Sequence, residues 1–110
     1  MKLKIRNKII SHKHKPFIIS ELGINHSGSL EAAKRMVDLS LTNGADAIKN
    51  QTHILDNEMI SEAKKIQPAN ANESIYNVIK KNYLKFDDEV KLKKYVEKKK
   101  SIYMSTPFSL

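Results

Sequence analysis

The sequence predicts an α/β protein whose strands run parallel to one another. Three short apolar segments, at residues 17–22, 45–48 and 101–106, alternate along the chain with segments of helical periodicity. A strand, a helix and a second strand within about 30 residues form a βαβ unit, which implies parallel strands and a right-handed crossover. The first apolar segment shows no period-two alternation, as expected for a parallel strand that is covered on both faces.

The first βαβ unit has clear start and stop signals. Pro16 precedes the strand over 17–22, and a polar loop follows that strand. Ser29 is a good N-cap and Asn43-Gly44 supplies a left-handed exit, so we expect a helix of about 14 residues between them. Its inner face is formed by apolar residues at helical spacing: Leu30, Ala33, Val37 and Leu41.

The remaining elements are a loop, two helices and a strand. We expect residues 54–72 to be ordered because several of their apolar side chains need cover: Ile54, Leu55, Met59, Ile60 and Ile66. Ser74 caps a short helix that extends to about Tyr83. A further helix begins near Asp87 and ends in a Lys run at 98–100, a charge order that complements the helix dipole. Its inner face is formed by Leu92, Tyr95 and Val96.

The positive charge of the chain lies at its two ends. The 110 residues carry 20 Lys and Arg against 12 Asp and Glu, a formal net charge of +8. Residues 1–15 hold six basic residues and no acid, and we treat them as a basic N-terminal arm. Only two of the 20 cations are Arg, whereas nucleic-acid readers concentrate Arg on one recognition surface. We therefore expect no nucleic-acid partner and interpret the charge as a solvated Lys-rich surface.

Several classes of protein are excluded by what the chain lacks. No apolar stretch approaches the roughly 20 residues that a membrane-spanning helix needs, so we expect no membrane association. The first ten residues alternate basic with aliphatic side chains and contain no secretion signal. Zero cysteines exclude disulfides and thiolate chemistry. A cytoplasmic location fits these observations.

Polar side chains follow each predicted strand, where ligands bind in parallel α/β folds. Glu21 comes at the end of the first strand, Lys49 and Gln51 follow the second, and Thr106 closes the third. If the strands are neighbours, these four side chains meet at one rim. Lys49 and Thr106 suit an anionic substrate because ammonium and hydroxyl groups donate to carboxylate or phosphate oxygens. The Glu21 carboxylate is suited to general acid–base catalysis, acting on a water molecule or on a proton.

Each of these four residues also has a structural interpretation. From spacing alone, Glu21 is equally suited to an ion pair with Lys49 across adjacent strands. Side chains such as those of Gln51 and Thr106 commonly satisfy backbone groups of loops. Both interpretations remain open at this point.

The histidines and glycines of the loops do not form a known ligand motif. His26 and His53 each stand alone in their segments, without the spacing of a metal-binding motif, so we interpret them as loop histidines. Gly23 and Gly28 lack the glycine order of a phosphate-binding fingerprint. We assign no metal ligand within this chain.

Four segments of the chain carry motifs that belong together. They are KPFIISELGINHSGSL at 15–30, GADAIKNQTHI with DNEM at 44–59, SIY at 74–76 and STPFS at 105–109. In this order they resemble the sialic acid synthase family. The Gln-Thr-His-Ile form at 51–54 is most similar to N-acetylneuraminate synthases, with legionaminic and pseudaminic acid synthases as close alternatives.

The resemblance implies a transferase that forms a carbon–carbon bond in sialic acid biosynthesis. Such enzymes condense phosphoenolpyruvate with N-acetylmannosamine, release phosphate and work as homodimers on a (β/α)₈ TIM barrel. A divalent metal, Mn²⁺ or Mg²⁺, serves as Lewis acid, on ligands that this chain does not contain. By resemblance, Glu21 is the catalytic carboxylate, Lys49 and Thr106 hold phosphoenolpyruvate, and Gln51 is a substrate-contacting amide.

The length of the chain limits what it supplies. A complete barrel needs roughly 250 residues. We therefore expect residues 16–110 to be the N-terminal portion of a barrel, truncated after the third strand position and without the C-terminal antifreeze-like domain of the family. We expect this portion to be inactive alone. The alternatives are another phosphoenolpyruvate-dependent aldol-type enzyme, and a non-catalytic truncated product or basic interaction module.

Overall fold

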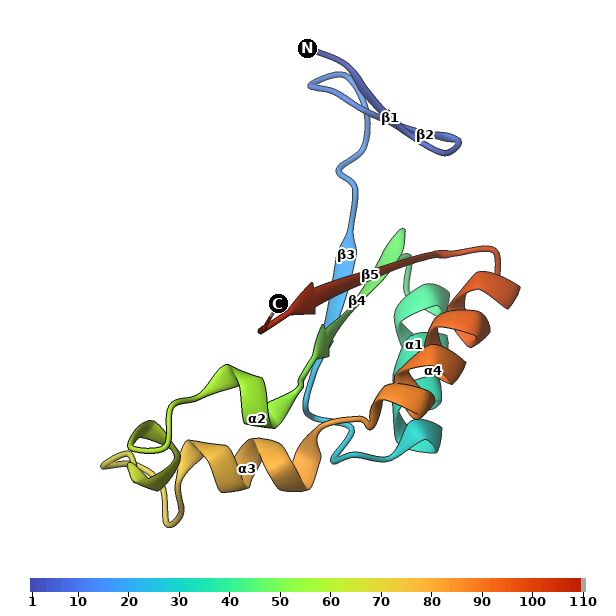
Figure 1. The fold of residues 1–110 in the computed structure, drawn as a ribbon. Helices are drawn as coiled ribbons and strands as arrows, with labels where there is room; N and C mark the ends of the chain where they lie inside the picture. Colours follow the sequence, from blue (N-terminus) through green and yellow to red (C-terminus); the bar gives the residue numbers. More distant parts are fainter. Residues whose placement is uncertain (110) are drawn as a thin grey trace.

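The computed structural model describes residues 1–109 of the chain. Two short strands are followed by alternating strands and helices (Figure 1). The elements are β1 (Leu3–Ile5), β2 (Lys8–Ile10), β3 (Ile19–Gly23), α1 (Leu30–Thr42), β4 (Ala47–Thr52), α2 (Leu55–Glu58), the 3₁₀ helix η1 (Ala63–Lys65), α3 (Ile75–Asn82), α4 (Phe86–Lys98) and β5 (Ile102–Pro107). Within residues 1–109, every helix is too short or too polar to cross a membrane.

A three-stranded parallel sheet forms the centre of the molecule. Its strand order is β3-β4-β5, and both pairings are parallel, which confirms the α/β class and the βαβ prediction. Glu21 pairs with Lys49, and Gln51 pairs with Thr106. β4 begins at Ala47 and continues to Thr52, so its polar end belongs to the strand and not to a loop.

Helices α1 and α4 pack side by side on one face of this sheet (Figure 1). The buried core consists of their apolar stripes, the sheet residues that face them and one residue of the connection between α3 and α4. These residues are Leu22, Ala33, Val37, Ile48, Leu84, Leu92 and Val96. In the described part of the chain, no helix contacts the opposite face of the strands. Because side chains alternate between the faces of a strand, every second residue of β3, β4 and β5 is directed away from the helices.

The ends of two helices follow the predicted signals. Ser29 Oγ accepts a hydrogen bond from the Ala32 N–H at 3.2 Å, and Ser74 Oγ accepts one from the Asn77 N–H at 3.3 Å. Gly44 follows α1 with a φ of +94°, a conformation that glycine adopts without steric cost. The predicted N-caps of α1 and α3 and the exit of α1 are confirmed.

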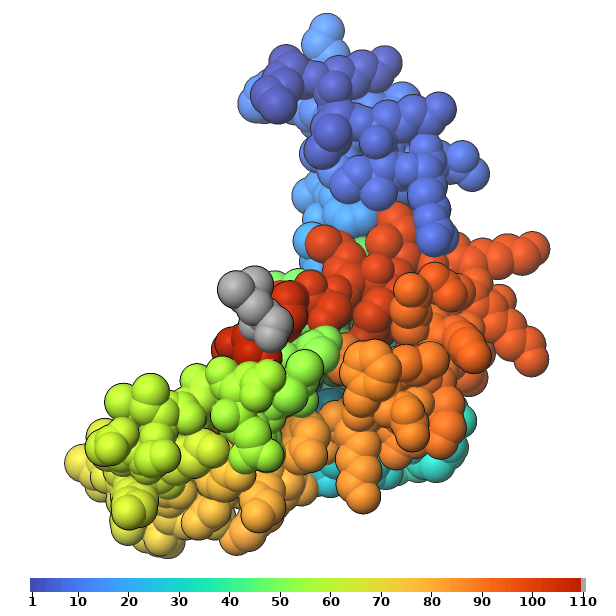
Figure 2. Space-filling model, viewed as in Figure 1, coloured from blue at the N-terminus to red at the C-terminus, as the bar shows by residue number. Residues whose placement is uncertain are grey.

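Residues 54–72 are built from α2, η1 and connecting turns, as expected of an ordered segment. The expectation that all of their apolar side chains are covered is wrong. Leu55 is buried, but Ile54, Ile60 and Ile66 are exposed, Ile60 to 70%. The physical reason is that α2 and η1 contact α3 and not the sheet, so they have a single layer to pack against. Figure 2 shows this segment protruding at the end of the molecule opposite β1 and β2.

The basic N-terminal arm forms a β-hairpin that the sequence analysis does not predict. β1 and β2 are antiparallel, and the turn between them places Arg6 at a φ of +51°. The hairpin lies beyond the amino-terminal ends of the parallel strands (Figure 1). Lys8 Nζ lies 2.6 Å from Asp46 Oδ1, and the Arg6 guanidinium donates to the Ser101 carbonyl at 3.0 Å. Two of the arm's cations therefore attach it to the body.

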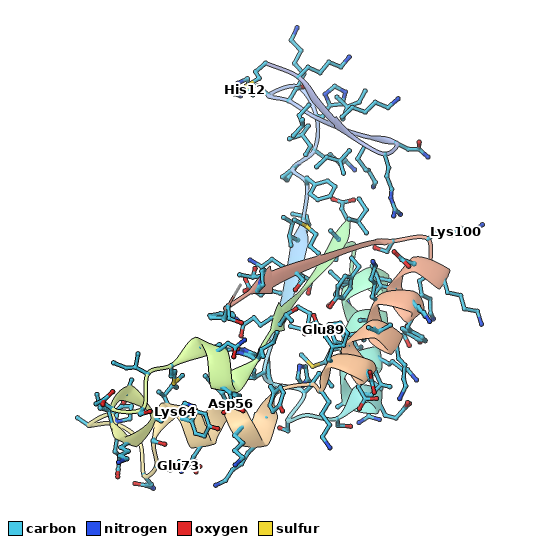
Figure 3. The ribbon with its side chains drawn as sticks, viewed as in Figure 1. His12, Asp56, Lys64, Glu73, Glu89 and Lys100 are labelled. Atoms are coloured by element: carbon cyan, nitrogen blue, oxygen red, sulfur yellow. The ribbon has the colours of Figure 1, made fainter. Side chains whose placement is uncertain are left out.

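A buried carboxylate joins α4 to the sheet. Glu89 is only 6% exposed and lies between α4 and the strands (Figure 3). Its Oε1 accepts hydrogen bonds from Thr52 Oγ1 at 2.5 Å, from the Tyr103 hydroxyl at 2.7 Å and from Ser105 Oγ at 3.4 Å. Burial, and secondly the bond to Glu89, raises the pKa of Tyr103, so its phenol keeps the proton that it donates. The network ties the carboxyl end of β4 and two residues of β5, Tyr103 and Ser105, to one helix.

Replacing Glu89 is expected to destabilise the fold. Glu89→Ala removes the acceptor of three hydroxyl groups, two half-buried (Thr52 and Tyr103) and one exposed (Ser105), and we expect the free energy of unfolding to fall by about 2 kcal/mol. Glu89→Gln keeps one acceptor oxygen and should cost about 1 kcal/mol. Denaturant unfolding of the full-length gene product measures both values. Glu97→Ala, at an exposed position of the same helix, is the matched control. Equal effects of Glu89→Ala and Glu97→Ala would contradict the network's role.

Asp46 is expected to hold the hairpin to the sheet in a pH-dependent way. The Lys8 ammonium, and secondly the Ile18 N–H, lowers the pKa of the Asp46 carboxyl. Its stabilising contribution is complete above the ordinary carboxyl pKa and is lost as the pH falls through the lowered value. At pH 7, Asp46→Asn should speed amide hydrogen exchange at Ile18 about fivefold, the loss of roughly one hydrogen bond. Asp38→Asn removes an ion pair with Lys99 elsewhere and should leave Ile18 unchanged.

Candidate functional site

The four predicted site residues lie on the same face of the sheet. On the helix-covered face, Ser20 Oγ contacts Ser40 of α1 and Thr52 contacts Glu89 of α4. Alternation therefore directs the neighbouring side chains to the opposite face. These are Glu21, Lys49, Gln51 and Thr106, all in the carboxyl-terminal halves of their strands or at mid-strand.

Glu21 and Lys49 form an ion pair across β3 and β4. Lys49 Nζ lies 3.3 Å from Glu21 Oε2, and the two side chains are 28% and 49% exposed, respectively. The cross-strand pair weighed in the sequence analysis is therefore present. A half-exposed pair contributes little to stability, because water screens it. Both groups thus remain accessible to a ligand on this face.

Gln51 and Thr106 lie next to each other, two residues beyond Lys49 in the direction of the strand ends. They are partners in the register of β4 and β5, and both are partly exposed. Their backbone neighbours Thr52 and Ser105 reach the Glu89 carboxylate on the other face. One surface therefore carries the ammonium of Lys49, the amide of Gln51 and the hydroxyl of Thr106. The Glu21 carboxylate lies beside the ammonium.

The two loop histidines are buried. His26 is 2% exposed, and its Nδ1 accepts a hydrogen bond from the Gly28 N–H at 3.2 Å. Burial lowers the pKa of His26, which favours the neutral imidazole that this bond requires. His53 Nδ1 lies 2.9 Å from Glu58 Oε2, and the His53 ring stacks on Phe108 with ring centroids 4.6 Å apart.

A hollow of about 420 Å³ adjoins Gln51 at the carboxyl ends of the strands. Its polar lining consists of Gln51, His53 and Glu58, and its apolar lining consists of Ile24, Met59, Ile75, Ile79 and Phe108. A larger hollow of about 580 Å³ lies between the hairpin and the amino ends of the strands, next to Lys8 and Asp46. We assign the site to the smaller hollow and the adjacent open face, because the converging polar groups lie there.

The described residues do not form a metal site by themselves. No group of three or more His, Cys, Asp and Glu side chains within residues 1–109 has the arrangement needed to hold a metal ion. Glu21 is paired with Lys49, and His53 is paired with Glu58. Residues 1–109 therefore do not fit the divalent metal that the family resemblance implies, and no chemical step is assigned to it.

Two residues of the site region were missed in the sequence analysis. Glu89 falls in the first turn of the helix predicted to begin near Asp87, and it also stands three and seven residues before the core residues Leu92 and Val96. That spacing places it on the buried face of α4. Glu58 was noted only as part of a motif, and its contact with His53 depends on the turn made by α2.

Comparisons with known proteins identify the family. The model of the NeuB family matches residues 36–110. The chain is 31% identical over 100 residues to an N,N'-diacetyllegionaminic acid synthase from Campylobacter jejuni, covering 87% of this chain and 30% of that protein. It is 37% identical over 97 residues to the protein of the same name from Legionella pneumophila, covering 84% and 27%.

A solved structure agrees with these matches. The N-acetylneuraminic acid (sialic acid) synthetase of Leptospira borgpetersenii superposes with a TM-score of 0.77 at 28% identity, over 100% of this chain and 35% of that one. The chain thus spans about a third or less of the relatives that it matches. Together, the family match and the relatives show that this chain belongs to the NeuB family, whose characterised members include synthases of sialic, legionaminic and pseudaminic acids.

Proposed function

We propose that the protein containing this chain is a phosphoenolpyruvate-dependent nonulosonic acid synthase. The observation that carries the proposal is the gathering of Glu21, Lys49, Gln51 and Thr106 on one sheet face. This set offers an ammonium and a hydroxyl for an anion, an amide for a sugar and a carboxylate for proton transfer. Family membership supports the same reaction class.

We propose further that β3, β4 and β5 are the first three strands of a (β/α)₈ barrel. The helix-free face supports this, because it carries exposed apolar side chains, Ile19 at 44% and Met104 at 37%. β3 and β5 are also edge strands in the described part of the chain. Further strands of a barrel would pair with these edges and enclose the open face.

In this proposal, each of the four residues has a separate role in one condensation reaction. Lys49 and Thr106 bind the phosphoenolpyruvate anion, and Gln51 contacts the amino sugar. C3 of phosphoenolpyruvate forms a bond to the aldehyde carbon of the open-chain sugar, and water then adds at C2. Glu21 accepts the proton of that water, and the former aldehyde oxygen takes up a proton to become a hydroxyl. The tetrahedral intermediate then expels phosphate by breaking its C2–O bond, and the proton of the C2 hydroxyl leaves with the phosphate. The Glu21–Lys49 pair holds the carboxylate next to the anion site.

The sugar, the metal and the assembly belong to the proposal as well. N-acetylmannosamine is the proposed sugar, and the substrates of legionaminic or pseudaminic acid synthases are the alternatives that the relatives support. Mn²⁺ or Mg²⁺ is the proposed metal, on ligands outside residues 1–109. A homodimer in the cytoplasm is proposed from the resemblance. A role as a basic interaction module is less favoured, since Arg6 and Lys8 are engaged within the fold.

Glu21→Gln is expected to abolish most of the activity. The change keeps the shape of the side chain but removes its ability to accept a proton, so kcat should fall by about 100- to 1000-fold. The assay follows phosphate release from phosphoenolpyruvate and N-acetylmannosamine, with and without Mn²⁺, using the full-length gene product. Glu31→Gln, on the exposed side of α1, is the control and should keep wild-type activity. Full activity of Glu21→Gln would remove Glu21 from the mechanism.

Lys49→Met is expected to weaken phosphoenolpyruvate binding selectively. Met keeps the apolar stem but removes the charge, and loss of one charge-assisted hydrogen bond corresponds to a rise of about 10- to 100-fold in the KM for phosphoenolpyruvate. The KM for the sugar should change much less. Lys34→Met on α1, which also breaks an ion pair, is the matched control. A rise confined to the sugar KM would reverse the assignments of Lys49 and Gln51.

A further inference from the structure

A chain of three polar side chains leads from α2 to the candidate site. Glu58 Oε2 lies 2.9 Å from His53 Nδ1, and His53 Nε2 lies 3.4 Å from Gln51 Oε1. All three line the 420 Å³ hollow, but only the last of them, Gln51, also lies on the open face of the sheet. The other two have no role in the proposed reaction.

The first two members of this chain are held rigidly. The His53 and Glu58 side chains are 3% and 4% exposed, respectively. Glu58 Oε1 also accepts a hydrogen bond from the Ile54 N–H at 2.6 Å, so both oxygens of this carboxylate are engaged. The Phe108 ring stacks on the imidazole at an interplanar angle of 19°. The imidazole therefore has little freedom to turn.

The two contacts of the His53 ring restrict which atoms donate hydrogen bonds. An ionised carboxylate only accepts hydrogen bonds, so His53 Nδ1 carries a proton toward Glu58. At its other nitrogen, His53 faces the carbonyl oxygen of the Gln51 amide, which also only accepts. Both contacts are satisfied together when each ring nitrogen bears a hydrogen, that is, with His53 as an imidazolium between the Glu58 carboxylate and the Gln51 oxygen, which is then occupied. Within residues 1–109, the Gln51 NH₂ group makes no hydrogen bond, and the residue lines the 420 Å³ hollow.

We propose that Glu58 and His53 are positioning residues that fix the Gln51 amide with its NH₂ group toward the substrate. This inference rests on the proposed function and deepens it. It assigns Gln51 the role of a donor, which selects an acceptor oxygen of the amino sugar, either a hydroxyl or an acyl carbonyl. An amide that rotates freely would present its NH₂ and its oxygen in turn and lose this selection. Glu58 and His53 act only through Gln51.

A double-mutant cycle in the full-length gene product tests this coupling. Gln51→Ala removes the amide, and His53→Phe keeps an aromatic ring for the stack on Phe108 but removes both ring nitrogens. We expect kcat/KM for the sugar to fall about 30-fold for Gln51→Ala and about tenfold for His53→Phe, the scale of one to two hydrogen bonds. The double variant should be no more than about threefold worse than Gln51→Ala. The KM for phosphoenolpyruvate should not change.

Independent effects of the two substitutions would overturn the proposal. If the two changes multiply to about 300-fold, His53 does not act through Gln51 and the proposal fails. Should His53→Phe fold poorly, Glu58→Gln takes its place in the same cycle, because Gln keeps the size of the side chain and an acceptor for Ile54. His12→Phe and Glu62→Gln, both at exposed positions, are the matched controls.

A structural readout separates this inference from the proposed function. If the unaltered protein releases no phosphate with any of the sugars, the proposed function fails, and crystal structures of the parent and of His53→Phe then decide the inference. A single Gln51 orientation in the parent, with more than one in the variant, supports the positioning role. The same single orientation in both would overturn it.

Discussion

Parallel pairing of β3, β4 and β5 places Glu21 beside Lys49 and Gln51 beside Thr106. Because successive side chains of a strand point to opposite faces, this register also directs Ile48 and Thr52 toward the helices. A slip of one residue would exchange the two sets, burying the ammonium and the amide and exposing the core. The core and the site therefore depend on the same pairing.

The helix-covered face of the sheet stabilises the fold, and the open face carries the candidate site. On the helix side, burial of aliphatic side chains from α1, α4 and the strands supplies the core. The Glu89 carboxylate adds hydrogen bonds between α4 and strands β4 and β5. On the other side, the Glu21–Lys49 pair is half-exposed and adds little stability. In the proposed function, this pair serves substrate binding.

The network on the helix side also holds the site side chains in place. Thr52 and Ser105, which reach Glu89, are the direct chain neighbours of Gln51 and Thr106. At the carboxyl end of β4, His53 is held by Glu58 and Phe108. Contacts outside the open face thus restrain the backbone on which the site is built. Such support from rigid elements is what a site needs to keep its geometry.

The amino-acid sequence alone predicts the α/β class, the parallel direction of the strands, the caps at Ser29 and Ser74, and the four polar residues at the strand ends. These follow from local signals: apolar periodicity, capping residues and the position of polar side chains after apolar runs. Only the tertiary structure decided that Glu89 and His53 are buried and what they contact, because these contacts join residues far apart or depend on the turn made by α2. The hairpin of residues 3–10 was missed for a related reason: two three-residue strands carry too little pattern, and attachment through Lys8 and Arg6 to the body appears only in three dimensions.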